Sequence, residues 1–177
     1  ILERFVGSGT FVANQKVQEK MSGVTGFTDL MLAQGKQPSS KTISYHVMSP
    51  SLSESEKLKL KDETQVLRME RVRYGDDVPI SFEVATIPLE IVEGLSKQEV
   101  SESLYRTLEA KKGLVPGHAK QMVSASSASE RIAEYLNIKR GDAILRLRQI
   151  SYLQDGRPFE YVRTQYVGER FEFVLEK

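Results

Sequence analysis

The chain has 177 residues, with 25 Lys and Arg, 24 Asp and Glu, and no cysteine. Its length is typical of one domain with a buried core, and the lack of cysteine excludes disulfide bonds, thiolate metal sites and cysteine nucleophiles. The net charge of +1 lacks the basic excess of a domain that wraps nucleic acid by itself, and no apolar run approaches the roughly 20 residues of a membrane-spanning helix.

The first third of the chain predicts short elements separated by polar turns. In chain order they are a turn at 7–9, a strand at 10–12, a polar linker at 13–21, a helix from Thr25 to Gly35, a loop at 38–40, a strand at 41–48 and a helix at 53–60. Thr25 or Thr28 is the expected N-cap of the first helix, and the spacing of Ser53 and Glu56 predicts a capping box in the second. Because Ile1 is not a natural start, we also expect the chain to be a fragment.

A pattern in this part of the chain returns 78 residues later. The two copies run through Leu58-x-Leu60, Val66-Leu67-Arg68-Met69, Val72 and Tyr74, and through Leu136-x-Ile138, Ile144-Leu145-Arg146-Leu147, Ile150 and Tyr152. We interpret each copy as a short helix, a tight turn and a long hairpin with a polar tip; the alternative is a chance likeness of two ordinary hairpins. A helix at 101–112, a strand at 114–124 and a helix at 128–136 complete the prediction. The fold class is therefore α+β, with one antiparallel sheet and pseudo-twofold symmetry.

The first hairpin is expected to gather charged residues on one face of that sheet. Its apolar residues between Val72 and Val84 occupy even positions, so burying them together requires an odd-length loop such as 75–77. That register places on the opposite face Arg71, Arg73, Ser81 and Glu83. Two interpretations stay open: a solvated ladder of ion pairs that adds little stability, or an anion pocket, since Arg suits forked recognition of phosphate or carboxylate.

Other polar groups are candidates for the same site. Glu160 and Tyr166 share a face of the second hairpin, where they bind sugar hydroxyls or form the polar face of an edge strand. The helix start at Phe27-Thr28 offers backbone N–H groups to an anion. Ser103 and Tyr105 add hydroxyls at the start of another helix, although every helix has such an N-terminus.

The sequence carries no signature of catalysis or of metal binding. His46 and His118 lie far apart without a partner motif, and we expect both to be structural. No Gly-x-x-x-x-Gly-Lys phosphate motif, nucleophile elbow or His-Glu-x-x-His occurs. We predict no catalytic residue, no metal ligand and no cofactor.

Several short motifs follow one another at specific spacings over nearly the whole chain. They are Gly7-Ser8-Gly9-Thr10-Phe11-Val12, Gly26-Phe27-Thr28-Asp29-x-Met31, Arg71-Val72-Arg73, Pro79-x-x-x-Glu83-x-x-x-Ile87-Pro88, Ser103-x-Tyr105, Gly141-x-x-x-Leu145, Phe159-Glu160 and Tyr166-x-Gly168-x-Arg170-Phe171-x-Phe173. In this order they resemble the effector-binding (UTRA) domain of GntR-family transcriptional regulators of the HutC type. The resemblance implies a chorismate-lyase-like α+β fold, an antiparallel sheet with flanking helices.

The same resemblance implies how the protein is organised. Residues 1–12 are then the remnant of a winged-helix DNA-binding domain, ending in its wing strand, 13–21 are the linker, and 22–177 are the UTRA domain. Such regulators are cytoplasmic homodimers, usually repressors, in which a small molecule modulates binding of the winged-helix domain to operator DNA. Without its recognition helix, this chain is not expected to bind the operator.

Within the family the chain is most similar to regulators that respond to glucosamine-6-phosphate or N-acetylglucosamine-6-phosphate. The resemblance implies a phosphate held by Phe27, Thr28, Arg71, Ser103 and Tyr105, and a sugar in contact with Arg73, Glu83, Glu160 and Tyr166. Other relatives sense trehalose-6-phosphate, urocanate or phosphonate-related ligands, which stay open as alternatives. The fold also occurs in an enzyme, chorismate lyase, but a wing remnant serves no purpose in an enzyme, so we expect a sensor.

Overall fold

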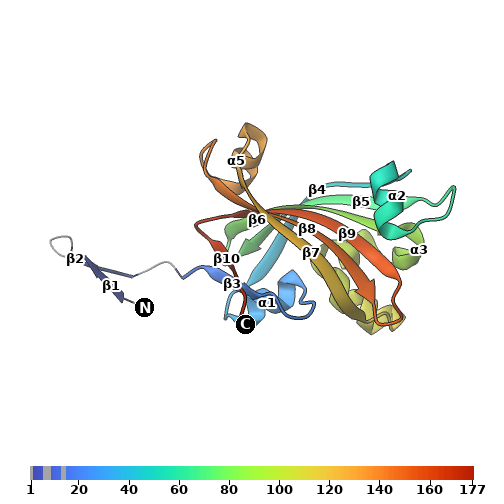
Figure 1. The fold of residues 1–177 in the computed structure, drawn as a ribbon, viewed down its shortest axis with the longest axis horizontal. Coiled ribbons are helices and arrows are strands. Elements are labelled where there is room, and N and C mark those ends of the chain that lie inside the picture. The colour runs from blue at the N-terminus through green and yellow to red at the C-terminus, as the bar shows by residue number, and fades with distance from the viewer. Residues whose placement is uncertain (1, 6–8, 13–14) are drawn as a thin grey trace.

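Six strands form one antiparallel sheet, in the order β4-β5-β6-β9-β8-β7 (Figure 1). The computed structural model describes residues 2–5, 9–12 and 15–177, with side chains from Gln15 onward. The strands of the sheet are β4 (Pro38–Met48), β5 (Val66–Gly75), β6 (Val78–Pro88), β7 (Pro116–Ser127), β8 (Ala143–Leu153) and β9 (Pro158–Val167). This architecture confirms the predicted α+β class and its antiparallel sheet.

The sheet consists of two similar halves that meet at β6 and β9. The order β4-β5-β6 on one side is repeated as β7-β8-β9 on the other, and the hairpins β5–β6 and β8–β9 are joined by the antiparallel β6–β9 pair. A helix precedes each hairpin, α2 (Leu52–Leu58) and α5 (Glu130–Leu136). Both helices end on a left-handed residue, Lys59 and Asn137, each with φ of 51°. These two residues lie 78 positions apart, so the internal repeat is present in the fold.

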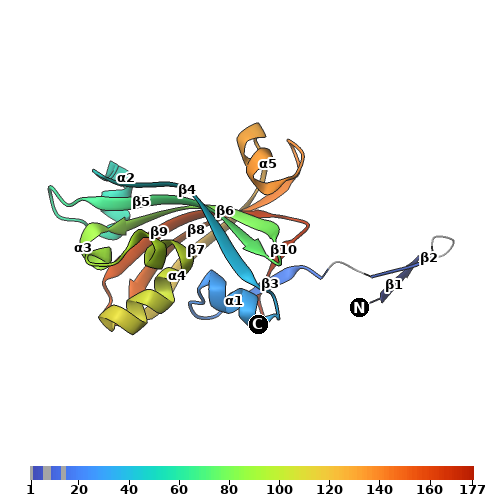
Figure 2. The same cartoon turned by 180° about the vertical axis from the view of Figure 1, so that it is seen from behind.

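The helices lie on opposite faces of the sheet (Figure 2). One face, called the inner face below, is covered by α1 (Phe27–Ala33), α3 (Leu89–Val92) and α4 (Lys97–Thr107), which continues into a π-helical turn, η1 (Leu108–Lys112). Helices α2 and α5 lie over the outer face, near its two ends. Among the described residues, no helix is long and apolar enough to cross a membrane.

The largest hydrophobic cluster lies between the inner face and α3, α4 and η1. Leu67 and Met69 of β5 pack there against Leu104 and Leu108, and all four are at most 3% exposed. A second cluster joins α5 to the outer face. A third packs α1 against the strand pair β3 (Val17–Lys20) and β10 (Phe171–Val174). Both faces of the sheet are therefore covered. A polar side chain buried there is unfavourable unless it is hydrogen-bonded or paired with an opposite charge.

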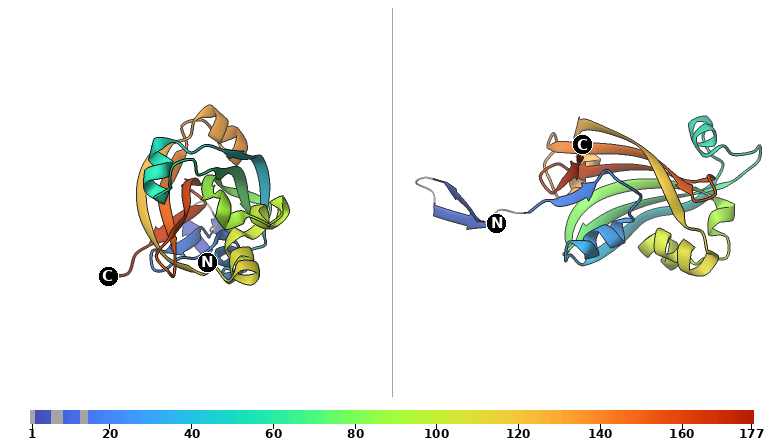
Figure 3. Two further views of the ribbon diagram at one scale, coloured as in Figure 1. Left: turned by 90° about the vertical axis from the view of Figure 1, so that its right-hand side faces the viewer. Right: turned by 60° about the horizontal axis from the view of Figure 1, so that its bottom comes forward.

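The segment expected to be a linker contains the strand β3. Residues 17–20 pair in parallel with β10 (Figure 3). Val17 in this strand is only 1% exposed. The sequence did not indicate this strand because its partner lies about 150 residues away and the segment itself is polar. Residues 13–14 of the expected linker and residues 7–8 of the predicted turn at 7–9 lie outside the described residues. Gly9 begins β2 (Gly9–Val12), which contains the expected strand 10–12 and pairs with β1 (Leu2–Phe5).

Several predicted helix starts are wrong by a few residues. The capping box of α2 is formed by Ser51 and Glu54, not by Ser53 and Glu56. Helix α1 has Gly26 as its N-cap, without a side-chain hydrogen bond, instead of Thr25 or Thr28. In each case several Ser, Thr or Gly residues adjoin the helix, and only packing decides which one caps it.

Two further boundaries differ from the sequence prediction. Helix α4 begins at Lys97, after a capping box formed by Ser96 and Glu99, and not at Ser101. The expected loop at 38–40 belongs to β4, because these residues pair with residues 73–75 of β5. The neighbouring strand therefore extends β4 beyond what its own alternating pattern suggests.

The hairpin β5–β6 has the predicted facing register but a different turn. Only Asp76 and Asp77 form the loop, with φ of 51° and 61°, and a bulge lies between Arg73 and Tyr74. The bulge adds one residue, Ile80, to β6, so it restores the parity that the predicted three-residue loop would have given. Arg71 consequently lies opposite Glu83 and Arg73 opposite Ser81, and the four residues share one face, as predicted from the sequence.

Candidate functional site

A cavity opens between the inner face of the sheet, α1 and α4. All nine residues that were predicted as site residues line it: Phe27, Thr28, Arg71, Arg73, Glu83, Ser103, Tyr105, Glu160 and Tyr166. Five come from the strands β5, β6 and β9, and four come from the helices α1 and α4. The structure thus brings residues more than 130 positions apart in the sequence into one site.

The centre of the cavity floor is the ion pair between Arg71 and Glu83. The two side chains are 3% and 8% exposed, and one guanidinium nitrogen of Arg71 donates to a carboxylate oxygen of Glu83. The other terminal nitrogen donates to the carbonyl oxygen of Ser101 in α4, at 2.7 Å. Burial by itself would raise the pKa of the Glu83 carboxyl, but the charges of Arg71 and Arg73 outweigh it and lower that pKa. Glu83 is therefore ionised at neutral pH.

Arg73 is a buried cation with few partners. It is 3% exposed, and one of its terminal nitrogens lies 3.7 Å from a carboxylate oxygen of Glu83. Its guanidinium carbon lies 4.6 Å from the ring centroid of Phe27. Its Nε has no hydrogen-bond partner among the described residues, and neither has the hydroxyl of Ser81, which faces Arg73 across the β5–β6 pair. Burial and the charge of Arg71 lower the pKa of Arg73 to about 10, so the guanidinium stays charged at neutral pH.

Residues at the start of α1 and at a kink in α4 form the wall of the cavity opposite the sheet. Gly26, the N-cap of α1, has no side chain to bond the first N–H groups of that helix, and a Cβ built on it would lie 3.4 Å from the Tyr105 ring. Helix α4 is kinked at Ser103, whose φ of −156° and ψ of 82° are not helical. Asp29 of α1 and Arg106 of α4 form an ion pair at 2.5 Å that joins the two helices.

The far end of the cavity carries a network of hydrogen bonds around Glu160. Tyr105 donates its phenol proton to Glu160 at 2.7 Å, and Ser151 lies 2.8 Å from the same phenol oxygen. The amide of Gln149 donates to Ser151 at 2.9 Å and receives a hydrogen bond from Gln121 at 2.6 Å. Burial raises the pKa of the Glu160 carboxyl, and the hydrogen bond from Tyr105 offsets this only in part.

Tyr166 forms the side wall between this network and the third hydrophobic cluster. Its ring stacks on Phe171 with centroids 3.8 Å apart, and the side chain is 7% exposed. Burial raises the pKa of its phenol well above the ordinary value, so the hydroxyl keeps its proton. It can donate that proton to a ligand in the cavity.

The cavity is also lined by residues that were not among the predicted site residues, including Glu19, Gln149 and Thr164. Thr164 shares a strand face with Glu160 and Tyr166, so the period-2 pattern of β9 already contained it. Gln149 lies opposite Gln121 on the β7–β8 pair, and its place in the cavity could be predicted only from the sheet register. Glu19 lies in the segment predicted as a linker, where no sequence signal placed it near the sheet.

The polar side chains that line the cavity are those of Arg, Glu, Gln, Ser, Thr and Tyr residues. Neither histidine lines the cavity: His46 is exposed, and His118 stacks on Tyr152 at 4.5 Å between ring centroids. Within the part of the chain that the structure describes, no group of three His, Asp or Glu residues could hold a metal ion. The cavity instead offers two guanidinium groups and several hydroxyl and carboxyl groups, an arrangement suited to holding a small anion with polar substituents.

Comparison with known protein families gives a match over most of the chain. Residues 33–172 match the model of the UTRA domain. Over 174 residues the chain is 30% identical to the HTH-type transcriptional repressor NagR of Bacillus subtilis, covering 98% of this chain and 72% of NagR. It is 27% identical to the mannosyl-D-glycerate transport/metabolism system repressor MngR of Escherichia coli, covering 99% of this chain and 73% of MngR. The uncharacterised Bacillus subtilis regulator YurK is 28% identical, and the match spans only 65% of its length.

Solved structures include two informative neighbours. A GntR-family transcriptional regulator from Enterococcus faecalis V583 is 62% identical, with a TM-score of 0.73 over 78% of this chain and all of that chain. PhnF from Mycobacterium smegmatis has a TM-score of 0.87 at 23% identity, over 99% of this chain and 77% of PhnF. At that level of identity PhnF supports the fold alone.

Proposed function

The chain belongs to the UTRA domain family of GntR-type transcriptional regulators, and from this premise we propose that it senses a phosphorylated sugar, most specifically an amino-sugar 6-phosphate. The domain is a ligand-sensing module of repressors in this family. The specific effector is glucosamine-6-phosphate or N-acetylglucosamine-6-phosphate. In this proposal the effector controls operator binding by a winged-helix domain, in a homodimer that acts in the cytoplasm.

The observation that carries the ligand class is the buried, under-partnered guanidinium of Arg73. A buried cation without sufficient hydrogen-bond acceptors is costly, and at the cavity floor the guanidiniums of Arg71 and Arg73 share the carboxylate of Glu83. A phosphate supplies the missing negative charge and several acceptor oxygens. The same argument does not favour a neutral or cationic effector.

The site residues divide between the two ends of such a ligand. Phe27, Thr28, Ser103 and Arg71 remain our phosphate-binding set, and the free donors of Arg73 extend from the phosphate to the sugar. Glu83, Glu160 and Tyr166 remain the sugar-binding set. Tyr105, also expected at the phosphate, donates its phenol proton to Glu160; this contact favours a role in orienting Glu160 toward the sugar hydroxyls.

Coupling to DNA binding would pass through α1 and β3. Residues 13–21 lead into α1, whose start lines the cavity, and 1–12 are proposed as the end of the winged-helix domain. A ligand that binds more tightly to one arrangement of α1 shifts the population toward that arrangement. An identical conformation of residues 15–26 with and without effector would contradict this coupling.

The test is a thermal-shift and calorimetric titration of the 177-residue chain against a panel of anions. The panel is glucosamine-6-phosphate, N-acetylglucosamine-6-phosphate, trehalose-6-phosphate, fructose-6-phosphate, urocanate and chorismate. At about 100 times its dissociation constant, the effector is expected to stabilise the fold by roughly 2.7 kcal/mol. Arg73→Gln should abolish the shift, and Arg163→Gln, a matched change on the outer face, should preserve it.

Other results would refute parts of the proposal. A thermal shift with urocanate alone would show that the ligand is not a sugar phosphate. The absence of a shift with every member of the panel would refute the proposed ligand class. Release of 4-hydroxybenzoate from chorismate would support an enzyme in place of a sensor. Sequence-specific DNA binding by this chain in a gel-shift experiment would contradict the assignment of operator recognition to a winged-helix domain.

A further inference from the structure

Glu19 is an acidic residue on the inward side of strand β3. The strand alternates in burial: Val17 is buried, Gln18 and Lys20 are exposed, and Glu19 is partly buried. Glu19 pairs with Phe173 of the neighbouring β10, whose ring packs edge-on against Tyr166. A carboxylate therefore occupies a position where the strand pattern calls for an apolar residue.

This carboxylate forms part of the cavity wall. Glu19 lines the site cavity together with Arg73 and Tyr166, and it also lines the outer groove beside α1 that Lys16, Gln34 and Lys36 border. Glu19 is thus, with Thr25 and Leu30, one of the side chains that lie between the cavity and the groove. Glu19 is also the residue of β3 that lines the cavity.

The hydrogen-bonding capacity of Glu19 is only partly used. An ionised carboxylate has about four acceptor positions. Among the described residues, the side-chain amide of Gln121 is the group that lowers its pKa, and no Lys or Arg forms an ion pair with it. Burial raises the pKa of Glu19 to about 7 because this single donor compensates poorly for lost water. The carboxylate consequently has free acceptor positions toward the cavity.

We propose that Glu19 is an effector-contacting residue, whose carboxylate accepts a hydrogen bond from a hydroxyl or ammonium group of the bound sugar phosphate and so holds β3 against the occupied site. This inference rests on the proposed function, because it assigns one more contact to the same ligand. It adds a specificity determinant on the segment that precedes the sensing domain's first helix.

A chain of side chains connects this contact to the opposite end of the cavity. Gln121, whose amide influences the pKa of Glu19, donates to Gln149, and Gln149 donates to Ser151, which lies 3.3 Å from Glu160. A sugar that bonds both Glu160 and Glu19 therefore links β3 to the polar network of β7, β8 and β9. Through this link β3 responds to occupancy independently of the phosphate contacts at α1.

The experiment compares Glu19→Gln with wild type in calorimetric titrations against glucosamine-6-phosphate and glucose-6-phosphate. The substitution keeps the size of the side chain and removes its charge. We expect affinity to fall about tenfold or more, as for loss of a hydrogen bond to a charged group. A larger loss for the amino sugar identifies an ammonium contact, and equal losses identify a hydroxyl contact. Glu172→Gln, on the other face of the same strand pair, is the matched control and should bind as wild type does.

Hydrogen exchange gives a second readout that a purely structural role would not produce. In wild type, the effector should increase protection of the amides of both β3 and α1. In Glu19→Gln, saturating effector should still protect α1 but should no longer increase the protection of β3. The thermal midpoint of the free variant verifies that it is folded.

The outcomes separate this inference from the proposed function. If wild type binds a sugar phosphate, Arg73→Gln does not, and Glu19→Gln binds as tightly as wild type, the role of Glu19 is refuted and the proposed function stands. If wild type binds neither sugar phosphate nor any other member of the panel, both are refuted. Weakened binding together with unchanged β3 protection would refute the link between Glu19 and the strand.

Discussion

Arg71 and Glu83 lie directly opposite each other on β5 and β6, and their ion pair forms the floor of the cavity. The pair is almost wholly removed from solvent, and Arg73 lies beside it on the same face. Desolvation of three charged groups is unfavourable unless each finds partners. The pair therefore contributes to the stability of the fold and to the charge of the site together.

Replacing Glu83 by Gln should destabilise the protein strongly. The change leaves two buried guanidiniums without their carboxylate, which typically costs about 3–5 kcal/mol. Urea unfolding in a buffer without phosphate or sulfate measures the loss, and added sulfate should restore part of it. Glu70→Gln, at the more exposed pair with Arg131, should change stability by less than about 1 kcal/mol. Equal effects of the two changes would contradict this account.

Breaking the ion pair between Asp29 and Arg106 should affect binding more than stability. The two side chains are 43% and 53% exposed, and such pairs are worth about 0–1 kcal/mol. Because the pair joins α1 to α4 across the cavity, Arg106→Gln should lower effector affinity several-fold, as measured by calorimetry. Arg157→Gln, which removes an equally exposed pair far from the cavity, is the control. Parallel losses of affinity in both variants would rule out a specific role for Arg106.

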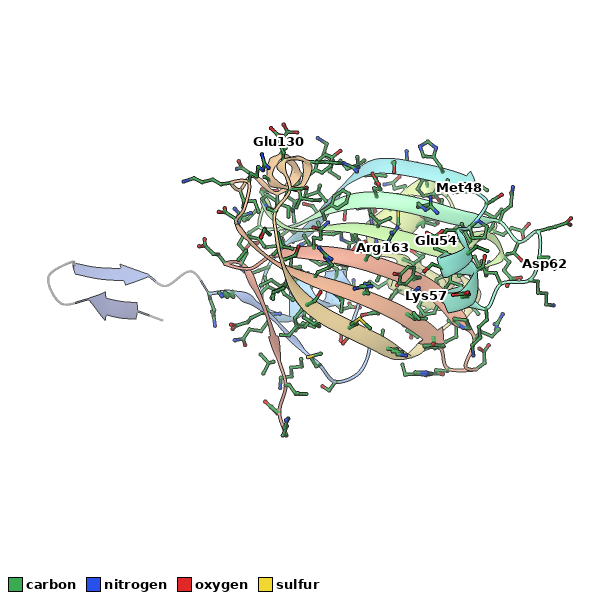
Figure 4. All side chains as sticks on the ribbon, turned by 45° about the horizontal axis from the view of Figure 1, so that its top comes forward. Met48, Glu54, Lys57, Asp62, Glu130 and Arg163 are labelled. Carbon is green, nitrogen blue, oxygen red and sulfur yellow. The ribbon has the colours of Figure 1, made fainter. Side chains whose placement is uncertain are left out.

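Glu54 should contribute stability that is lost in acid. It lies over the outer face of the sheet near Arg163 (Figure 4). Burial would raise the pKa of this carboxyl, but hydrogen bonds from Ser51, Arg68 and Thr86 outweigh it and lower the pKa to about 2. Its unfolded pKa is near 4.5, so the contribution is present above that pH and disappears as the pH falls through about 2.

The difference in unfolding free energy between wild type and Glu54→Gln measures this contribution. It should be largest at neutral pH and should shrink steadily below pH 4.5. Glu56→Gln changes an exposed carboxylate of the same helix and should show little difference at any pH. A constant difference between pH 7 and pH 2 would show that ionisation of Glu54 is not the cause.

Glu19 should give the opposite pH dependence. Burial raises its pKa to about 7 from an unfolded value of 4.5, so the folded chain retains a proton that the unfolded chain has released. Stability should therefore fall as the pH rises from about 4.5 to 7 and stay lower above that range. Glu19→Gln should lack this slope in thermal unfolding, and its stability relative to wild type should rise with pH. A slope shared by both proteins would assign it to another group.

The sequence by itself determined the sheet and the content of its inner face. The alternation of residues along β5, β6 and β9 has a period of two, which is a local property of an extended chain. That alternation therefore placed Arg71, Arg73 and Glu83 on one face before any contact was known. The internal repeat likewise predicted the two joined hairpins. The division into phosphate and sugar contacts came from the family resemblance, and their ligand roles remain predictions.

Only the tertiary structure decided how the cavity is closed. The bulge beside Arg73, the kink at Ser103 and the choice of Gly26 as helix cap depend on packing between elements distant in sequence. Glu19 enters the site because β3 pairs with β10, about 150 residues further along the chain. A short polar strand has little local preference for its conformation and takes it from its partner. For that reason the residue that links the preceding segment to the site was not visible in the sequence.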